Sequence, residues 1–163
     1  MESLISNILE YSSIANDIDK NVDVDLNITL EDVTRLLLIP EEISLELLKK
    51  LPVVKGDATK FQQIFQNLIS NAIKFSNKEK GLIKIDYTET VSCYQFSVED
   101  NGIGIEKKHY NKIFKIFYSL NESKESSGIG LSIVKKIVEL YEGNIWIEST
   151  EGEGSKFYFT IRK

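Results

Sequence analysis

One long amphipathic segment, residues 56–76 (GDATKFQQIFQNLISNAIKFS), constrains the fold of this chain more than any other stretch. Its apolar residues recur at the spacing of an α-helix that packs on a core, and Asp57 is placed to cap the first turn. The segment therefore predicts a central helix on which other elements pack. Its apolar side carries Phe61, Ile64, Phe65, Leu68, Ile69, Ala72 and Ile73.

The opposite side of this predicted helix is unusual because it carries neutral amides instead of charges. Gln63, Asn67, Ser70, Asn71 and Lys74 fall within roughly 100° of arc, and no charged residue stands between positions 61 and 73. A solvated helix face normally carries Glu and Lys pairs. Amide oxygens suit a hard cation such as Mg²⁺, which shares its shell with substrate phosphates. The alternative is a helix covered by another element, with its amides bonded to backbone.

Composition limits the classes of ligand. The 163 residues fit one domain with an appendage and suffice for a real core. A net charge of −5 gives no electrostatic footprint for nucleic acid, so anionic ligands must be met by local devices. One cysteine and one histidine exclude an internal disulfide and a His/Cys metal cluster.

Membrane segments are not expected in this chain. The longest uninterrupted apolar run, residues 36–39, is far too short to span a bilayer. Glu2 follows Met1 where a signal peptide has a basic region. We therefore expect a cytoplasmic domain that makes no membrane contact itself, although a longer parent protein can be membrane-anchored.

Hydrophobic periodicity predicts an α+β domain. Adjacent strands late in the chain predict a two-layer α/β sandwich, in which a mixed, mostly antiparallel sheet carries helices on one face. Residues 3–18 read as a helical appendage outside the core, and residues 119–127 read as a polar mobile loop. Besides the central helix within 56–76, the predicted helices are one that starts at Thr29 or Glu31 and runs to 38, 106–117 and 131–141, and the predicted strands are 24–28, 43–52, 82–87, 91–99, 145–149 and 156–161.

A glycine-containing loop, VEDNGIGIE (98–106), follows one of the predicted strands. Asp100, at the end of that strand, is placed to accept a hydrogen bond from an amine such as that of adenine. Gly102 and Gly104 permit positive φ and allow a ligand to approach the backbone closely. The alternative is an Asn-Gly turn without a ligand. Lys107 stands where a dinucleotide-binding fingerprint has its third glycine, which excludes that motif.

A second glycine loop, SSGIG (126–130), opens the helix predicted at 131–141. Free backbone N–H groups and the helix dipole at such a start bind phosphate without a basic residue. No Gly-Lys-Ser/Thr follows a glycine loop, so a P-loop is absent. The alternative is an ordinary glycine-rich helix start.

Four stretches in order resemble the ATP-binding catalytic domain of sensor histidine kinases, within the class that includes gyrase and the Hsp90 chaperones. NLISNAIKFS is similar to the N box of that family, DNGIG to its first glycine box, IFKIFY to its F box and GIGLSIVKKIVELYEG to its second glycine box. The resemblance implies a catalytic domain over 21–163 with a Bergerat-type ATP-binding fold. Residues 1–20 resemble the last turns of the dimerisation and phosphoacceptor hairpin that precedes it.

The resemblance also implies which residues hold Mg-ATP between the central helix and a flexible lid. Asn71 would ligate Mg²⁺, Asn67 would support the metal and phosphate region, and Lys74 would reach the phosphates, which makes these three the expected catalytic residues. Phe75 would pack near the base, and Asp100 would bind the adenine amine. The remaining nucleotide-binding residues implied in this way are Gly102, Ile103, Gly104, Phe117, Lys124, Gly128, Ile129, Gly130 and Leu131.

One position separates the branches of this class. Members that hydrolyse ATP carry a Glu, as a base for water, four residues before the metal-binding Asn; here that residue is Asn67. An imidazole nucleophile needs no base, so positioning and charge neutralisation suffice. We therefore expect transfer of the γ-phosphoryl group to a histidine on a separate dimerisation domain, with a response regulator downstream.

Two other functions stay open. Many family members carry Arg where this chain has Ser119, and the only cation of the short lid is Lys124. These departures favour a regulatory nucleotide-binding or partner-docking module that transfers no phosphate. A protein-serine kinase of the same class is the third possibility. His109, the only histidine, lacks the sequence context of a phosphoacceptor and is expected to be a surface residue.

Overall fold

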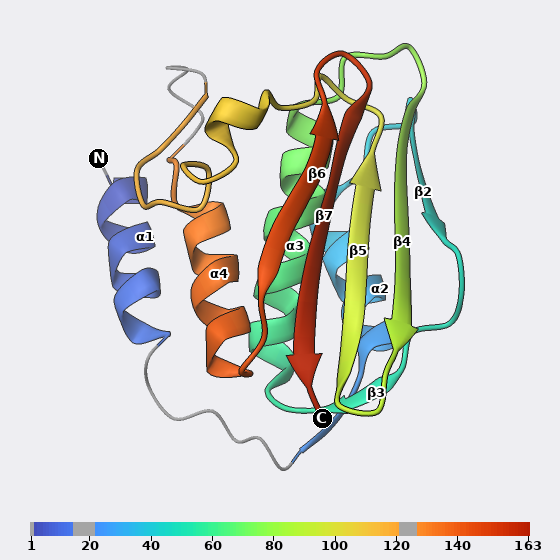
Figure 1. The fold of residues 1–163 in the computed structure, drawn as a ribbon, viewed down its shortest axis with the longest axis vertical. Helices are drawn as coiled ribbons and strands as arrows, with labels where there is room; N and C mark the ends of the chain where they lie inside the picture. The colour runs from blue at the N-terminus through green and yellow to red at the C-terminus, as the bar shows by residue number, and fades with distance from the viewer. Residues whose placement is uncertain (1, 15–21, 121–126) are drawn as a thin grey trace.

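The computed structural model describes residues 2–14, 22–120 and 127–163, arranged as a layer of helices beside a twisted sheet (Figure 1). The elements in chain order are α1 (Glu2–Ser13), β1 (Asp23–Asp25), α2 (Leu26–Leu37), β2 (Ile43–Leu47), β3 (Val53–Lys55), α3 (Ala58–Lys74), β4 (Gly81–Glu89), β5 (Cys93–Asp100), the 3₁₀ helix η1 (Lys107–His109), α4 (Gly130–Leu140), β6 (Ile145–Thr150) and β7 (Gly154–Arg162).

The main sheet has five strands in the order β2-β4-β5-β7-β6. Only the β2–β4 pair is parallel, and the other three pairs are antiparallel. A separate two-stranded sheet pairs β1 with β3. The predicted fold class, an α+β two-layer sandwich with a mixed, mostly antiparallel sheet, is confirmed.

The core lies between α3 and the centre of this sheet. The Phe65 ring meets Phe96 of β5 and Phe159 of β7 edge-on, with centroids 6.3 and 5.9 Å away. Phe96 and Phe159 stack on each other at 5.0 Å, and all three side chains are at most 1% exposed. Phe61 stacks on Tyr141, just after α4, at 4.9 Å. The apolar face read from the sequence therefore fixes the position of α3.

The N-terminus of α3 is capped as the sequence predicts. The side chain of Asp57 accepts a hydrogen bond of 2.8 Å from the backbone N–H of Thr59. The backbone N–H of Asp57 donates to the hydroxyl of Tyr141 at 2.9 Å. Burial is the main cause that raises the pKa of that hydroxyl. The same residue thus starts α3 and links it to the end of α4.

The strand predicted at 24–28 is wrong beyond residue 25. Asp25 accepts a hydrogen bond of 2.9 Å from the backbone N–H of Asn27, so it ends β1 and caps α2. Leu26, Leu30 and Val33 are buried at helical spacing. The alternation of Val24 with two further apolar residues was misleading because the cap lies inside it.

The helix predicted at 106–117 is also wrong, because only η1 forms there, followed by turns. The hydroxyl of Tyr110 donates to the backbone oxygen of Ser149 at 2.5 Å and accepts from its N–H at 2.8 Å. Phe117 adopts a φ of 64°, which no α-helix contains. This long-range attachment to β6 replaces helical hydrogen bonds. The short strand β3 was missed as well, since three residues give no periodicity.

Helix α1 lies beside α4 (Figure 1) and contacts the domain through its C-terminal half. Ile14 is fully buried in the core. Lys136 of α4 donates to the backbone oxygen of Tyr11 at 2.6 Å and lies 4.2 Å from its ring centroid. Gln63 of α3 donates to the carboxylate of Glu10 at 2.7 Å. The expectation that this segment stays outside the core is therefore wrong at its end.

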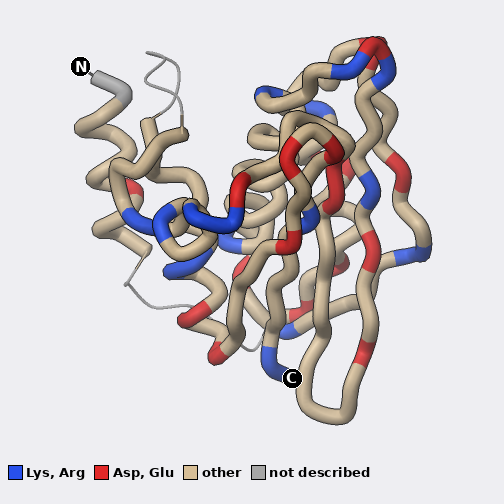
Figure 2. The backbone as a smooth tube through the Cα atoms, turned by 45° about the horizontal axis from the view of Figure 1, so that its top comes forward, with Lys and Arg blue, Asp and Glu red and all other residues tan. Residues whose placement is uncertain are grey.

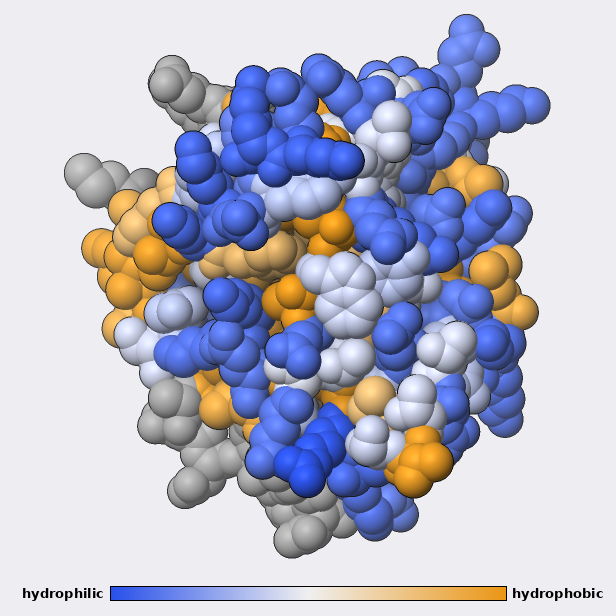
Figure 3. All heavy atoms as spheres, viewed as in Figure 1, coloured by the Kyte–Doolittle hydropathy of each residue, from blue (hydrophilic) through white to orange (hydrophobic). Residues whose placement is uncertain are grey.

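Residues 4–9 of α1 expose apolar side chains, which gather at the left edge of Figure 3. These exposed side chains are Leu4, Ile5, Ile8 and Leu9. Within the described residues, no helix is long and apolar enough to cross a membrane.

Charged residues of both signs are interspersed over the strands (Figure 2). Lys156 of β7 lies 3.3 Å from Glu99 of β5, and Lys49 lies 3.3 Å from Asp86 of β4. Partly exposed pairs of this kind contribute at most about 1 kcal/mol each. These surface ion pairs therefore contribute little to the stability of the sheet.

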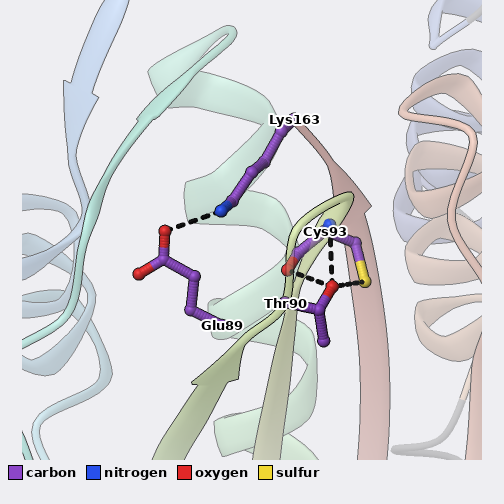
Figure 4. A network of polar contacts seen from close by, with 4 residues as sticks. All are labelled: Glu89, Thr90, Cys93 and Lys163. Carbon is purple, nitrogen blue, oxygen red and sulfur yellow. Dashed lines mark hydrogen bonds and ion pairs between the residues drawn. The ribbon is translucent and has the colours of Figure 1, made fainter.

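The turn between β4 and β5 is closed by its own polar groups (Figure 4). The hydroxyl of Thr90 accepts from the backbone N–H of Cys93 and lies 3.0 Å from its backbone oxygen. Lys163 binds the carboxylate of Glu89 at 2.7 Å, which ties the last residue to this turn. The polar groups of this turn are therefore paired with one another or with the last residue of the chain.

Candidate functional site

A cavity of about 210 Å³ lies where the polar face of α3, the end of β5 and the start of α4 meet. Of the residues singled out from the sequence, ten line it, and they come from three separate motifs. The folded chain thus brings distant segments to one place. These ten residues are Asn67, Asn71, Lys74, Phe75, Asp100, Ile103, Gly104, Gly128, Gly130 and Leu131.

Three predicted residues of the described part of the chain do not line the cavity, and a fourth, Lys124, is outside the described residues. Ile129 is 1% exposed and belongs to the core. Phe117 is 52% exposed. Gly102 packs against the backbone oxygen of Phe75. The loop predicted at 119–127 is described only at its two ends, so its interior is likewise outside these residues.

The polar face of α3 supplies one wall. The side-chain amide nitrogen of Asn67 donates to the backbone oxygen of Gln63 at 2.8 Å, which fixes the orientation of its amide. Gly130, the first residue of α4, sits directly against this amide: a Cβ there would lie 2.8 Å from the Asn67 Oδ1 atom. Lys74 holds its Nζ 5.6 Å from the Phe75 ring centroid. Part of the alternative reading is thus right, since one amide does bond to backbone, but the face opens onto a cavity.

Asp100 supplies the acidic group of the cavity. Its Oδ1 accepts a 2.8 Å hydrogen bond from the backbone N–H of Gly102. Burial raises the pKa of the Asp100 carboxyl, and nearby Glu99 raises it further, while backbone hydrogen bonds from Gly102 and Ser155 lower it. A half-buried carboxyl whose pKa is raised by burial inside a cavity is characteristic of functional sites.

The glycines of the first loop serve backbone packing. Gly104 has a φ of 70°, and a Cβ there would lie 2.1 Å from the backbone oxygen of Thr150. A Cβ at Gly102 would lie 2.5 Å from the backbone oxygen of Phe75. Of the two, only Gly104 adopts a positive φ. The close approach expected for a ligand is therefore made, at both positions, by another part of the chain.

The two ends of segment 119–127 meet at Gly128. Its φ is 66°, and a Cβ there would lie 2.8 Å from the backbone carbon of Phe117 and 2.9 Å from the backbone oxygen of Tyr118. Phe117 itself has positive φ, a conformation that costs a non-glycine residue about 1–3 kcal/mol. Strained backbone of this kind is commonly found beside functional sites.

Sequence reasoning missed several lining residues. Tyr118 directly follows the F-box phenylalanine, so its place in the motif was a usable signal. Ser155 lies beside Asp100 because β7 pairs with β5 in that register, which no local pattern predicts. Ser70, part of the predicted polar face, and Ser119, the position where many family members carry Arg, also line the cavity, whereas the missed lining residues are Ile105, Ile113, Tyr118, Leu120, Ser127, Ser155 and Phe157.

The donors in the cavity fit a magnesium ion that is bound together with phosphates. Asn67, Ser70 and Asn71 offer neutral oxygen atoms on one helix face, and Lys74 adds a cation beside them. Among the described residues, no group of three or more His, Cys, Asp or Glu could hold a metal on its own. A hard cation here would depend on water and ligand oxygens, as Mg²⁺ commonly does.

The chain matches the model of one protein family, "Histidine kinase-, DNA gyrase B-, and HSP90-like ATPase", over residues 56–163. Cyanobacterial phytochrome B of Nostoc sp. (strain PCC 7120) is 39% identical over 170 residues, which cover 99% of this chain and 22% of that protein. Histidine protein kinase 1 of Candida albicans is 36% identical over 174 residues, covering 98% of this chain and 7% of that protein. The chain thus spans less than a quarter of either relative.

Solved structures give the same assignment. The catalytic domain of histidine kinase ThkA has a TM-score of 0.74 at 32% identity, and the match covers 87% of this chain and 95% of that domain. ThkA in complex with the response regulator protein TrrA has a TM-score of 0.76 at 29% identity, covering 99% of this chain and 47% of that one. The chain therefore belongs to the family of histidine kinase-, DNA gyrase B- and HSP90-like ATPases, and within it is a catalytic, ATP-binding domain of the sensor histidine kinase type.

Proposed function

We propose that this domain binds Mg-ATP in the cavity and transfers the γ-phosphoryl group to a histidine on a separate dimerisation domain. The observation that carries the proposal is the convergence of three motifs on one cavity, with a buried carboxyl on β5 and an amide face on α3. A purine amine and a magnesium-bound triphosphate are the ligand groups that match these two walls.

At the β5 wall, Asp100 recognises the base. Its Oδ1 is held by the Gly102 N–H, so the carboxylate keeps a fixed orientation while accepting from the exocyclic amine of adenine. Ile103 and Phe75 line the cavity nearby and offer apolar surface to the purine ring. Hydrogen bonds to an ionised carboxylate contribute about 1.5–3 kcal/mol, which makes this contact the main source of selectivity for adenine.

At the α3 wall, Asn71 and Asn67 hold the phosphate end. Asn71 is the proposed magnesium ligand, and Asn67 supports it with an amide fixed by the Gln63 backbone. Lys74 reaches the phosphates as a point charge, and the N-terminus of α4 at Gly130 adds backbone N–H groups. The bound Mg²⁺ would neutralise charge on the phosphates during transfer.

The lining favours phosphoryl transfer over ATP hydrolysis. Asp100 is the only carboxylate among the described lining residues, and its proposed partner is the base. Among the described lining residues, no second acid is therefore available beside the phosphates to activate water. An imidazole acceptor already has a free lone pair, so this chain's residues need only orient the reactants.

The partners follow from this chemistry. The acceptor histidine would come from a hairpin of which residues 1–20 are the proposed last turns, before a catalytic domain over 21–163. A response regulator would receive the phosphoryl group next; the relative ThkA has been crystallised with such a protein, TrrA. Because ATP is the donor, we place the reaction in the cytoplasm.

A transfer experiment tests the proposal directly. The 163-residue chain is mixed with Mg-ATP and a separate hairpin domain that bears the acceptor histidine, and acid-labile phosphate on the hairpin is measured. We expect labelling that is lost with Asn71→Ala and retained with Lys135→Ala, an exposed residue of α4 away from the cavity. Acid-stable phosphate would indicate a serine kinase instead.

A regulatory module without phosphotransfer is the second candidate. The feature that favours it is Ser119, which lines the cavity at the position where many family members carry Arg. Calorimetric binding of Mg-ATP with no transfer to any hairpin tested would support this candidate and contradict kinase activity.

A further inference from the structure

His109 is half-buried, contrary to the expectation of a surface residue. Its Nδ1 lies 2.5 Å from the hydroxyl oxygen of Tyr118, and the two ring centroids are 6.0 Å apart. Either the imidazole N–H or the phenol O–H donates this hydrogen bond, depending on the tautomer. The contact joins the 3₁₀ helix η1 to Tyr118, the residue that precedes segment 119–127.

Tyr118 belongs to the wall of the cavity. It lines the cavity with Ile105 and Ile113, and its backbone oxygen would lie 2.9 Å from a Cβ at Gly128. Its backbone N–H donates a hydrogen bond of 3.3 Å to the backbone oxygen of Lys115. The position of its ring therefore depends on the hydroxyl contact with His109.

The backbone around His109 is fixed by several hydrogen bonds. The next residue, Tyr110, exchanges two hydrogen bonds with the backbone of Ser149 in β6. The backbone of His109 donates to Glu106 at 3.0 Å and accepts from Ile113 at 3.0 Å. A continuous set of contacts thus leads from the sheet through η1 to the Tyr118 ring.

We propose that His109 is a positioning residue of the nucleotide site, which holds the Tyr118 ring against the cavity and thereby raises nucleotide affinity. This inference rests on the proposed function of the cavity. His109 does not touch the ligand itself and acts only through Tyr118.

The first test is a mutant cycle on nucleotide affinity, measured by calorimetry with Mg-ADP and the 163-residue chain. His109→Phe keeps a ring but removes the hydrogen bond, and Tyr118→Phe removes only the hydroxyl. Losing one such bond should weaken binding about three- to tenfold. The double variant should be no weaker than the poorer single variant, because both remove the same contact.

A conservative variant separates positioning from simple packing. His109→Asn keeps an amide near the position of Nδ1 and should recover at least half of the affinity lost in His109→Phe, on a logarithmic scale. Lys112→Ala, an exposed neighbour in the same segment, should bind like the parent. Thermal unfolding without nucleotide checks that each variant is folded.

The second test uses the fact that His109 is the only histidine. Its imidazole Cε1–H signal in a ¹³C-edited NMR spectrum needs no assignment. Saturating Mg-ADP should shift this signal in the parent, and Tyr118→Phe should reduce that shift by more than half. This readout stands even if the His109→Phe variant does not fold.

The outcomes discriminate between the two levels of the proposal. If the parent binds Mg-ADP while the single variants bind within twofold of it, or if their losses are additive, the positioning role is overturned and the nucleotide site remains. The positioning role is also overturned if saturating Mg-ADP does not shift the imidazole signal of His109. If the parent binds no adenine nucleotide, both proposals fail.

Discussion

The two ends of β5 use polar groups in opposite ways. At the Cys93 end, Thr90 and Cys93 satisfy each other, and Glu89 binds Lys163 at the surface (Figure 4). At the other end, the half-buried Asp100 carboxyl lines a cavity; burial raises its pKa, while backbone hydrogen bonds from Gly102 and Ser155 lower it. The first arrangement closes a turn. The second places an acid, whose pKa burial raises, where a ligand can reach it.

This difference separates stability from function. Groups that satisfy each other at an exposed turn contribute about 1 kcal/mol each to the fold and nothing to recognition. A carboxyl kept half-buried works against folding when it ionises, so its position is explained by a ligand. Substitutions at the two ends should therefore affect two different measurements.

Asp100→Asn should have the largest effect on binding. The amide keeps the shape of the side chain but loses the charge that accepts from the adenine amine, so Mg-ADP affinity should fall about 10- to 100-fold. Stability to urea at neutral pH should stay equal or rise, because the penalty of a buried charge is removed. Calorimetry and urea unfolding measure the two quantities. A large loss of stability with unchanged affinity would show that Asp100 is structural.

Gly130→Ala should come next, with binding about tenfold weaker. A Cβ at this position lies 2.8 Å from Oδ1 of Asn67, so the amide must leave its place beside the proposed magnesium site. Alanine favours a helix over glycine by about 1 kcal/mol, which should keep the protein folded. The affinity loss should appear with Mg-ADP and shrink with adenosine, which has no phosphates. An equal loss with both ligands would contradict the placement of the phosphates at α3.

The pH dependence of binding should show a smaller, several-fold effect. Because burial raises the folded-state pKa of Asp100, its contribution to stability is fully present below its unfolded pKa of about 3.9 and is lost as pH rises through the folded value. Nucleotide affinity has the opposite sign: it falls as pH is lowered and Asp100 becomes protonated. The phosphates of the nucleotide also titrate in this range. Dividing the affinity of the parent by that of Asp100→Asn at each pH removes their effect, because both proteins bind the same nucleotide. A ratio constant with pH would exclude this linkage.

Whether an element could be predicted from the sequence depends on how far apart along the chain the interacting residues are. The α3 face, its Asp57 cap and most strands of the main sheet were predictable because each depends on a local period or a local cap. The strand predicted at 43–52 is wrong beyond Leu47, where β2 ends. The segment around Tyr110 was not predictable, since its shape depends on Ser149, 39 residues away. The start of α2 failed for the opposite reason, a cap hidden inside an alternating pattern at Asp25.

The site follows the same rule. Asn71 and Asp100, which line the cavity, were predicted from motifs near the ends of α3 and β5. Ser155 was not found, since its place depends on the pairing of β7 with β5. His109 was misjudged because its neighbours in sequence are charged, whereas its partner Tyr118 is brought back by turns that periodicity does not predict. Local signals therefore locate the reactive groups, and tertiary contacts decide what supports them.

At the hairpin end, Thr90→Val should lower the free energy of unfolding by about 0.5–1.5 kcal/mol. The change keeps the shape of the side chain and removes the hydroxyl that bonds the backbone of Cys93. Nucleotide affinity should stay within twofold of the parent, because this turn lies at the opposite end of β5. Urea unfolding and calorimetry on the same sample test both halves. Weaker binding would show that the two ends of β5 are coupled.

Glu89→Gln should have the smallest effect. Its partner Lys163 is 31% exposed and Glu89 is 51% exposed, and solvent-exposed ion pairs of this kind contribute little to stability. The Glu89 hydrogen bond is the main cause that raises the pKa of Lys163. The loss should vanish in high salt, which screens such pairs, whereas the loss in Thr90→Val should persist. If salt reduces the stability losses of Glu89→Gln and Thr90→Val equally, charge holds the turn. The two ends of β5 would then differ only in how exposed their charged groups are.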